Sequence, residues 1–434
     1  MSRAYDQYRY FSEPGPLYEG IESLLPDPPQ EYPVRYIAYY LPQFHPIPEN
    51  DQWWGVGFTE WTNITRSLPG YVGHYQPRLP GELGFYNLST PDAMRRQAEL
   101  MKMGGVYGIC IHNYWFNGKK VLEKPLNILL ENRDIDIKFC INWANEPWTR
   151  RWDGSNQHVL LNQEHGAIDD VNYIESIIPA MEDDRYIKVN GRPVCMIYRP
   201  GIMPDPGATI ERWRETVYKA LGVNPYIIFP QAFGDDDPRA YEADAVSGFP
   251  PHGDKDVERI RHRLDLLDGR YWGLASCYKD LVRSAIERLT DEYTLFPGVC
   301  PSWDNEPRRR RAGRSFFGST PHAYGEWLLR ASQFVMNTQL GDERIVFINA
   351  WNEWAEGAYL EPDRHFGYAY LAETARTLVG LEGSEVKRPA AALRDHDLRY
   401  GRAKVQPWRY PINRARDATY RAARVLGLTA ERSA

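Results

Sequence analysis

The sequence predicts an α/β protein, a (β/α)8 TIM barrel built as a single domain within the 434-residue chain. Three observations favour this fold class. Short apolar runs rich in β-branched and aromatic residues recur eight times, stretches with helical spacing separate most of them, and polar side chains directly follow most of the runs. Eight strands that alternate with helices are typical of such a barrel.

Several of the apolar runs are continuous rather than alternating, as expected of parallel strands that are covered on both faces. An open, doubly wound sheet is the alternative, but no phosphate-binding glycine motif follows the first run. The runs at 244–248 and 295–300 are the least strand-like. Strands are predicted at 34–40, 106–111, 137–142, 194–198, 226–230, 244–248, 295–300 and 345–350, and helices at 91–103, 208–221, 279–289 and 321–336.

Composition divides the chain into three parts. Residues 1–30 are rich in Pro and Tyr and are interpreted as an N-terminal arm, and residues 31–385 form the barrel. Residues 386–434 form a basic tail with 12 Lys/Arg and 4 Asp/Glu, a net charge of +8 in a chain whose total is −6. The spacing at 413–428 is that of a basic amphipathic helix, which could contact an anionic membrane or polysaccharide, and a solvated extension is the alternative.

Charge and composition exclude several function classes. The acidic body and the lack of a recognisable binding module argue against nucleic acid as a partner. Neither a signal peptide nor an apolar stretch of about 18 residues is found, so we expect a cytoplasmic protein, with peripheral membrane contact through the tail as one alternative. Five scattered Cys and ten scattered His favour free thiols and no metal or other cofactor. The sequence gives no indication of the oligomeric state.

Aromatic and polar residues alternate where the predicted strands end, which in a barrel is the face that carries the active site. Flat rings stack on the apolar faces of a pyranose, and amide, imidazole and carboxylate groups hydrogen-bond its hydroxyls. A carbohydrate cleft is therefore the leading hypothesis, and plain core packing is the alternative. The candidate substrate-binding residues are Tyr40, His45, Trp54, Glu60, Trp61, His112, Asn113, Trp115, Asn142, Trp143, Asn145, Glu146, Trp148, Trp152, Tyr198, Asn352 and Trp354.

Glu353 and Glu356 are the candidate catalytic residues. They stand three positions apart just after the eighth strand, so a helical turn would place both carboxylates on one face. Cleavage of a glycosidic bond needs such a pair, one group to protonate the leaving oxygen and one to act as base or nucleophile. The alternative is that both are solvated loop residues that cap the next helix.

Several motifs together carry a family resemblance, which spans roughly residues 34–380. The segments IAYYLPQFH from residue 37, GFTEW from residue 57, WANEPW from residue 143 and WNEWAEG from residue 351 resemble the WbsX-like proteins. Those bacterial proteins are often described as glycosyltransferases of lipopolysaccharide or capsule synthesis. They are similar to glycoside hydrolase family 99, whose members are (β/α)8 barrels that cleave internal α-mannosidic bonds with retention.

The resemblance to family 99 implies a role for each carboxylate. Glu353 would act as a base on the 2-hydroxyl of the sugar, giving a 1,2-anhydro intermediate, and Glu356 would act first as general acid and then as base. Ala355 stands where the mannosidases commonly have His. The resemblance therefore implies the mechanism but not the identity of the substrate. Glu146 lies in an N-E-P element that resembles the acid/base element of another glycosidase clan. We keep it as a binding residue, with a Glu146 and Glu353 pair as the alternative mechanism.

Two charged runs remain. Asp235–Asp237 is interpreted as a solvated turn rather than a D-x-D metal site, and the run of arginines at 308–311 either meets an acidic or phosphate-bearing glycan or forms a solvated loop. The sequence thus predicts a retaining glycoside hydrolase that acts on an oligosaccharide or polysaccharide of a bacterial surface, such as O-antigen or capsule. A glycosyltransferase or transglycosylase of lipopolysaccharide or capsule biosynthesis and a non-catalytic glycan-binding scaffold are the alternatives.

Overall fold

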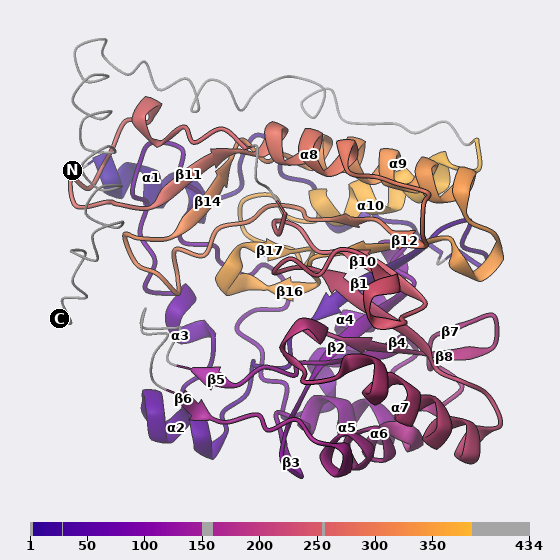
Figure 1. The fold of residues 1–434 in the computed structure, drawn as a ribbon. Helices are drawn as coiled ribbons and strands as arrows, with labels where there is room; N and C mark the ends of the chain where they lie inside the picture. Colours follow the sequence, from indigo (N-terminus) through magenta and orange to yellow (C-terminus); the bar gives the residue numbers. More distant parts are fainter. Residues whose placement is uncertain (1–2, 28, 150–158, 254–256, 384–434) are drawn as a thin grey trace.

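The computed structural model describes residues 3–27, 29–149, 159–253 and 257–383. Its centre is a barrel of nine parallel strands, in which hydrogen-bonded neighbours follow the order β12-β10-β9-β8-β4-β2-β1-β15-β13 (Figure 1). This arrangement confirms the predicted barrel. The strands are β1 (Arg35–Tyr40), β2 (Gly108–Phe116), β4 (Lys138–Trp143), β8 (Arg192–Ile197), β9 (Tyr226–Gln231), β10 (Ala245–Gly248), β12 (Leu295–Phe296), β13 (Gly298–Val299) and β15 (Ile345–Ile348).

The seventh predicted strand, 295–300, differs from the prediction because it is divided into β12 and β13. Pro297 lies between the two pieces and has no backbone N–H to donate, although its carbonyl accepts from Phe347 N at 2.8 Å. The first piece pairs with β10 through Leu295 and Val246, and the second pairs with β15 through Val299 and Ile348. The divided strand therefore changes partner at the proline and connects the two ends of the sheet.

Helices lie between the barrel strands along the chain. Pro occupies the first turn of α4, α7 and α9, where its missing N–H costs no intrahelical bond, and Thr320 caps α9 by accepting from Ala323 N at 3.0 Å. The predicted helix 91–103 has the observed bounds. The helices of the barrel are α4 (Pro91–Met103), α5 (Lys124–Glu131), α6 (Ala167–Met181), α7 (Pro206–Leu221), α8 (Tyr278–Glu287), α9 (Pro321–Thr338) and α10 (Ala369–Gly380).

Shorter elements decorate the barrel. Three of them are helices, α1 (Arg3–Ser12), α2 (Pro48–Trp54) and α3 (Trp61–Ile64), the last two in the long segment after β1. Single turns of 3-10 helix follow several strands, and among them η7 (Trp354–Glu356) lies beyond β15. The short strands are β3 (Lys119–Val121), β5 (Trp148–Thr149), β6 (Val159–Leu161), β7 (Lys188–Val189), β11 (Leu274–Cys277), β14 (Arg314–Phe317), β16 (Asn352–Glu353) and β17 (Ala358–Tyr359).

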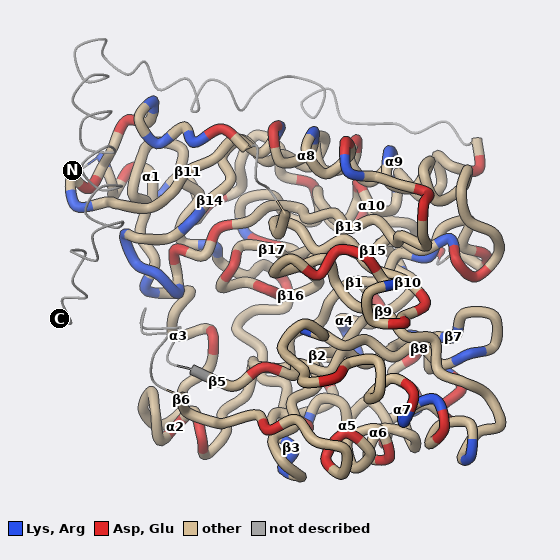
Figure 2. Tube along the Cα trace, in the orientation of Figure 1, with Lys and Arg blue, Asp and Glu red and all other residues tan. Residues whose placement is uncertain are grey.

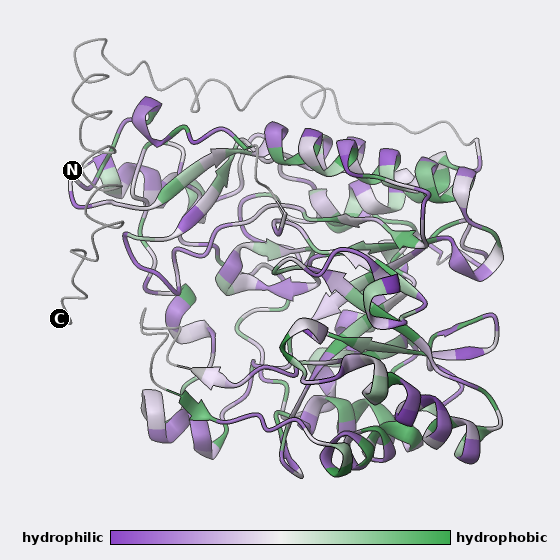
Figure 3. Cartoon of the chain, viewed as in Figure 1, coloured by the Kyte–Doolittle hydropathy of each residue, from purple (hydrophilic) through white to green (hydrophobic). Residues whose placement is uncertain are grey.

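The core is the interior of the barrel and the layer between strands and helices. All six residues of β1 are buried, which explains why Arg35 is the only charged residue in the predicted strand. Hydrophobic segments colour the strands, whereas α7 and α8 carry hydrophilic stretches (Figure 3). Charged residues of both signs are dispersed over the surface, and a run of basic residues marks the loop before β14 (Figure 2). No helix in the described ranges is long and apolar enough to cross a membrane.

The first 30 residues include α1, which packs on the body through buried Gln7 and Phe11. Gln7 accepts from Gly73 N at 2.7 Å, and Glu19 forms an ion pair with Arg376 on α10. These contacts attach the N-terminal segment to the loops beyond the barrel. The basic tail at 386–434 lies outside the described residues.

Candidate active site

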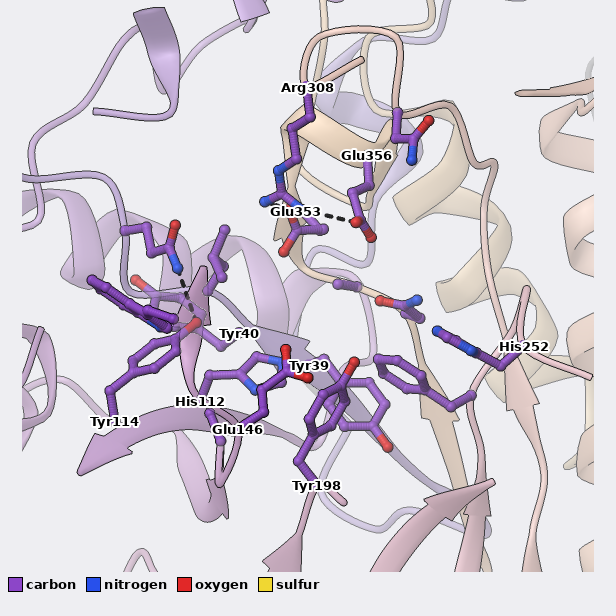
Figure 4. Close-up of a pocket in the computed structure, with 18 of the residues that line it drawn as sticks. Tyr39, Tyr40, His112, Tyr114, Glu146, Tyr198, His252, Arg308, Glu353 and Glu356 are labelled. Carbon is purple, nitrogen blue, oxygen red and sulfur yellow. Dashed lines mark hydrogen bonds and ion pairs between the residues drawn. The ribbon is translucent and has the colours of Figure 1, made fainter. Parts of the chain in front are cut away.

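A cavity of about 530 Å³ opens at the carboxyl ends of the barrel strands (Figure 4). It lies where the topology of a parallel barrel brings the loops after every strand together. Its wall combines rings and polar groups from widely separated parts of the chain. Among the lining residues are Tyr39, Tyr40, Gln43, Trp53, Trp54, His112, Tyr114, Glu146, Trp148, Tyr198, Phe233, Phe249, His252, Trp303, Arg308, Glu353 and Glu356.

Glu353 and Glu356 both line this cavity, and one guanidinium holds them together. Arg308 donates from Nη2 to Glu353 Oε1 at 2.6 Å and from Nη1 to Glu356 Oε1 at 2.8 Å. Trp303 Nε1 donates to the other oxygen of Glu356 at 3.3 Å. The Glu353 side chain is 11% exposed and that of Glu356 is 27% exposed, so Glu353 is the deeper of the two. The turn η7 between them brings both carboxylates to the same space, as their spacing predicts.

Glu60 is the third carboxylate on Arg308. Its side chain is fully buried, and its Oε2 accepts from Nε and Nη2 of Arg308 at 3.2 Å each. The segment after β1 therefore anchors the arginine from behind, while the arginine faces the cavity. Three acidic groups share one cation, and we call Glu60, Arg308, Glu353 and Glu356 the carboxylate cluster.

Burial favours the protonated form of Glu353 and of Glu60. Burial raises the pKa of Glu353 to about 8, and the nearby negative charges of Glu356 and Glu60 act in the same direction, while Arg308 opposes them. Burial also raises the pKa of Glu60. Because like charges in a small buried space cannot all ionise, the cluster is suited to holding one acid and one base at the same time.

The opposite wall carries recognition groups rather than a second acid pair. Glu146 forms an ion pair with Arg199 at 3.0 Å, and it faces the carboxylate cluster across the cavity (Figure 4). His112, on β2, is hydrogen-bonded through Nδ1 to the Asn142 amide at 3.1 Å, and burial lowers its pKa to about 4. A neutral imidazole held at a fixed angle can hydrogen-bond a sugar hydroxyl.

A buried network holds the segment that carries the two glutamates. Asn352 accepts from Leu41 N at 2.7 Å and donates to Leu41 O at 3.0 Å, which fixes β16 to the end of β1. Glu361 accepts from Trp354 Nε1 at 2.5 Å, Tyr86 OH at 3.0 Å and Gln97 Nε2 at 2.6 Å. These bonds fix the residues on either side of Glu353, so its side chain points into the cavity from a rigid support.

The structure divides the predicted substrate-binding residues into two groups. Tyr40, Trp54, His112, Glu146, Trp148 and Tyr198 line the cavity together with the two catalytic candidates. Others lie behind the wall: Asn142 and Glu60 contact lining residues, while Trp143 stacks on Tyr173 in the core. Outside the lining are His45, Glu60, Trp61, Asn113, Trp115, Asn142, Trp143, Asn145, Asn352 and Trp354, and Trp152 lies outside the described residues.

Sequence reasoning missed Arg308 as a site residue. The run of arginines at 308–311 is one signal, but a solvated loop is its more usual explanation and contact with an acidic or phosphate-bearing glycan is the alternative. The structure corrects the solvated-loop interpretation for Arg308, whose side chain is only 15% exposed, whereas Arg309, Arg310 and Arg311 are exposed. The loop turns one arginine inward because three carboxylates surround its guanidinium. In the described part of the chain, no group of three His, Cys, Asp or Glu residues is placed to hold a metal ion.

The chain is similar to known proteins in sequence and in fold. The family model described as "Glycosyltransferase WbsX" matches residues 36–374. The uncharacterized protein WxcX of Xanthomonas campestris pv. campestris is 43% identical over 368 residues, which cover 84% of this chain and 53% of that protein. The chain thus spans about half the length of the curated relatives it matches.

Two solved structures are similar in fold. One is described as a glycoside hydrolase-like protein, with a TM-score of 0.52 and 15% identity over 83% of this chain and 99% of the other. The other is the family 99 endo-α-mannosidase of Bacteroides thetaiotaomicron, with a TM-score of 0.50 and 15% identity over 81% and 98% of the two chains. At this level of identity the similarity shows the barrel fold alone.

Proposed function

The chain belongs to the WbsX glycosyltransferase family, and from that premise we propose that it is a carbohydrate-active enzyme that acts at a glycosidic bond of a bacterial surface polysaccharide. One observation carries the proposal. Glu353 and Glu356 face the same cavity and are held by the same guanidinium, with hydrogen bonds of 2.6 and 2.8 Å. Rings and polar groups that suit a pyranose line the rest of that cavity.

Hydrolysis with retention is the reaction that we propose. In the reactive form the proton that the pair retains is on Glu356, so that ionised Glu353 removes the proton of the sugar's 2-hydroxyl as that oxygen attacks the anomeric carbon, and Glu356 protonates the departing glycosidic oxygen. The product of this first step is a 1,2-anhydro sugar. In the second step Glu356 takes a proton from water, the water oxygen bonds to the anomeric carbon as the bond between that carbon and O2 breaks, and Glu353 returns its proton to O2. These roles follow the resemblance to glycoside hydrolase family 99.

Two features of the site support this assignment of roles. Glu356 is the more exposed carboxylate, so it is accessible to the departing oxygen and to incoming water. Glu353 is the deeper one and faces the part of the cavity where a ring would lie. Glu146 and His112 on the opposite wall would bind the hydroxyls of the same ring.

Transfer to an acceptor sugar is the second candidate. It needs the same two glutamates, because the hydroxyl of an acceptor takes the place of water in the second step. The family description as a glycosyltransferase favours it. The two reactions differ in whether water or a sugar hydroxyl reacts in the second step. The products of one incubation distinguish them, because hydrolysis gives a free sugar and transfer gives a new glycoside.

The test is an incubation of the protein with a panel of bacterial surface glycans and nucleotide sugars, followed by NMR of the anomeric protons. We expect a retained anomeric configuration in the first product. Replacing Glu356→Gln should lower turnover at least about a thousandfold while glycan binding stays measurable. The amide of Gln can still form hydrogen bonds with the glycan, but it cannot transfer a proton to the leaving oxygen.

The matched control is Glu326→Gln on α9, whose carboxylate is exposed and remote from the cavity. Unchanged turnover in the Glu356 variant would remove that residue from the mechanism. An inverted product would contradict the anhydro-sugar route. Binding without consumption of any glycan in the panel would favour a non-catalytic scaffold.

A further inference from the structure

We propose that Arg308 is a positioning residue for the proposed reaction, which aligns Glu353 and Glu356 by binding both and is itself held in place by Glu60. The role of Arg308 in catalysis rests on the proposed function, whereas its contacts with the three glutamates are observed in the structure. All three nitrogens of the guanidinium take part: Nε and Nη2 bind Glu60, Nη2 binds Glu353, and Nη1 binds Glu356. A planar fork of donors is the group best suited to hold several carboxylates in a fixed arrangement.

The members of the carboxylate cluster come from three separate segments of the chain. Glu60 follows β1, Arg308 follows β13, and the two remaining glutamates follow β15. These three strands are neighbours in the barrel, since β15 pairs with both β1 and β13. Arg308 therefore links the segments after β1 and β13 to the segment after β15, and through it they fix the distance between Glu353 and Glu356.

The loop that carries Arg308 is itself firmly held. Asp304 N donates to the carbonyl of Glu356 at 2.5 Å, and Arg308 N donates to the carbonyl of Asn305 at 3.1 Å. The Asp304 carboxylate accepts from His74 Nε2 at 2.8 Å and Gln76 Nε2 at 2.9 Å. Because the backbone of the loop is tied to the backbone of Glu356, the guanidinium cannot drift away from the two glutamates without breaking buried hydrogen bonds.

The electrostatic role of Arg308 has a definite sign. Its positive charge lowers the pKa of Glu353, whereas the charges of Glu60 and Glu356 raise it. Other titratable groups among the described residues that face this part of the cavity are Tyr114 and His112 on β2, Tyr198 after β8, His252 after β10, and Glu146 across the cavity. Removing the charge of Arg308, and removing only the charge of Glu60 by a change to Gln that keeps an acceptor for the arginine, should therefore move the pKa of Glu353 in opposite directions.

These contacts argue against the alternative that Arg308 binds an anionic group of the substrate. Its nitrogens already bind three carboxylates, and Glu60, its anchor, is fully buried. An arginine that waits for a substrate anion would be expected to keep donors directed into the cavity. Glu60 has no other evident purpose at this depth than to hold a cation, because an uncompensated buried carboxylate is costly.

The experiment is a pH titration of protein labelled with 13C at the glutamate side-chain carboxyl, followed by NMR without any glycan. Glu353→Gln and Glu356→Gln identify the signals of the pair. In Arg308→Gln we expect the last carboxyl proton of the pair to leave about one pH unit higher than in the unmodified protein, and in Glu60→Gln about one unit lower. Arg310→Gln is the matched control. The side chain of Arg310 is exposed, and Arg310 is not one of the residues that line the cavity.

Arg308→Lys separates charge from alignment. It keeps the positive charge but cannot bridge three carboxylates, so we expect a titration within about half a pH unit of the unmodified protein and a turnover reduced at least tenfold. If Arg308→Gln fails to fold, the Glu60→Gln and Arg308→Lys results still decide the matter.

Shifts of the same sign in Arg308→Gln and Glu60→Gln, or no shift in either folded variant, would overturn the proposal. So would full turnover in Arg308→Lys. Because the titration needs no substrate, opposite shifts in a protein that consumes no glycan would uphold the electrostatic link while the proposed function failed.

Discussion

At the scale of single residues, the site depends on the environment of its carboxylates more than on their presence. Glu353 and Glu361 lie eight positions apart, and burial raises the pKa of both, to about 8 and about 7. Only Glu353 lines the cavity, whereas Glu361 accepts hydrogen bonds from Trp354, Tyr86 and Gln97. The same type of side chain therefore faces the cavity in one place, where we propose a reaction, and supports the wall from behind in the other.

The pH dependence of the reaction should reflect the raised pKa of Glu353. The competent form has one carboxyl protonated and the other ionised, and the pair loses its last proton near pH 8. We expect kcat/KM to fall as the pH rises through about 8, with the full rate below that value and above the point at which the second proton binds. Because the pKa of His112 is about 4, its ionisation contributes nothing to this limb.

A pH–rate profile of kcat/KM between pH 5 and 10 checks this expectation. A profile that is flat through pH 8, or that rises there, would show that no proton of the carboxylate cluster is needed for the reaction.

At the scale of elements, the decisive unit is the segment from β16 to β17 that follows the last barrel strand. Its residues are almost all buried, and Gly357 takes the left-handed conformation (φ 60°) that lets the chain reverse directly after Glu356. The ring of Trp354 stacks on Tyr359 with centroids 3.8 Å apart. The buried contacts of this segment hold it rigid, so they also fix the position of Glu353.

Replacing Glu361→Ala should destabilise this segment. The change leaves the buried donors of Trp354, Tyr86 and Gln97 without their acceptor, at a cost of about 3 kcal/mol or more, since each unpaired buried donor costs about 1–3 kcal/mol. Urea unfolding measures the loss, and turnover should fall with it because Glu353 loses its support. Glu361→Gln keeps the volume and one acceptor oxygen, so it should cost less than the alanine variant. Equal stability of the two variants would contradict this role.

The sequence predicted the elements of the barrel better than the contents of its site. A buried parallel strand such as β15, with the sequence IVFI, is apolar along its whole length, so its pattern is local and readable. By contrast, Arg308 and Glu60 are 248 positions apart, and nothing local shows that they meet. Trp143 follows Asn142 on β4 and points to the opposite side of the sheet, into the helix layer, because successive strand residues alternate. Pattern alone could not tell which residues at a strand end face the cavity.

At the scale of the whole molecule, the charge is distributed unevenly along the chain. The tail at 386–434 has a net charge of +8, so the rest of the chain has −14. The family match ends at residue 374 and α10 at Gly380, so the barrel is complete before the tail begins. The tail is therefore separable from the proposed reaction, and its charge suits an anionic surface.

Truncation after Gly383 tests that separation. We expect the shortened protein to keep the thermal midpoint and turnover of the full chain, and to lose at least about tenfold in affinity for vesicles that contain anionic lipid, because each basic residue near such a surface contributes about 1 kcal/mol. Vesicles of neutral lipid are the control, and added salt should weaken the binding of the full chain. Equal affinity of the two proteins for anionic vesicles would show that the tail makes no such contact.

The placement of the charged cluster over three adjacent strands, β13, β15 and β1, has a consequence for how the family can diversify. Strand β2 supplies His112, and the segments after β4 and β8 supply Glu146 and Tyr198, from another arc of the rim. The carboxylate cluster and these three residues therefore occupy different sectors of one circle. Under the proposed function, we expect the glycan that is bound to vary with the loops of the second sector, while the reaction depends on the carboxylate cluster in the first.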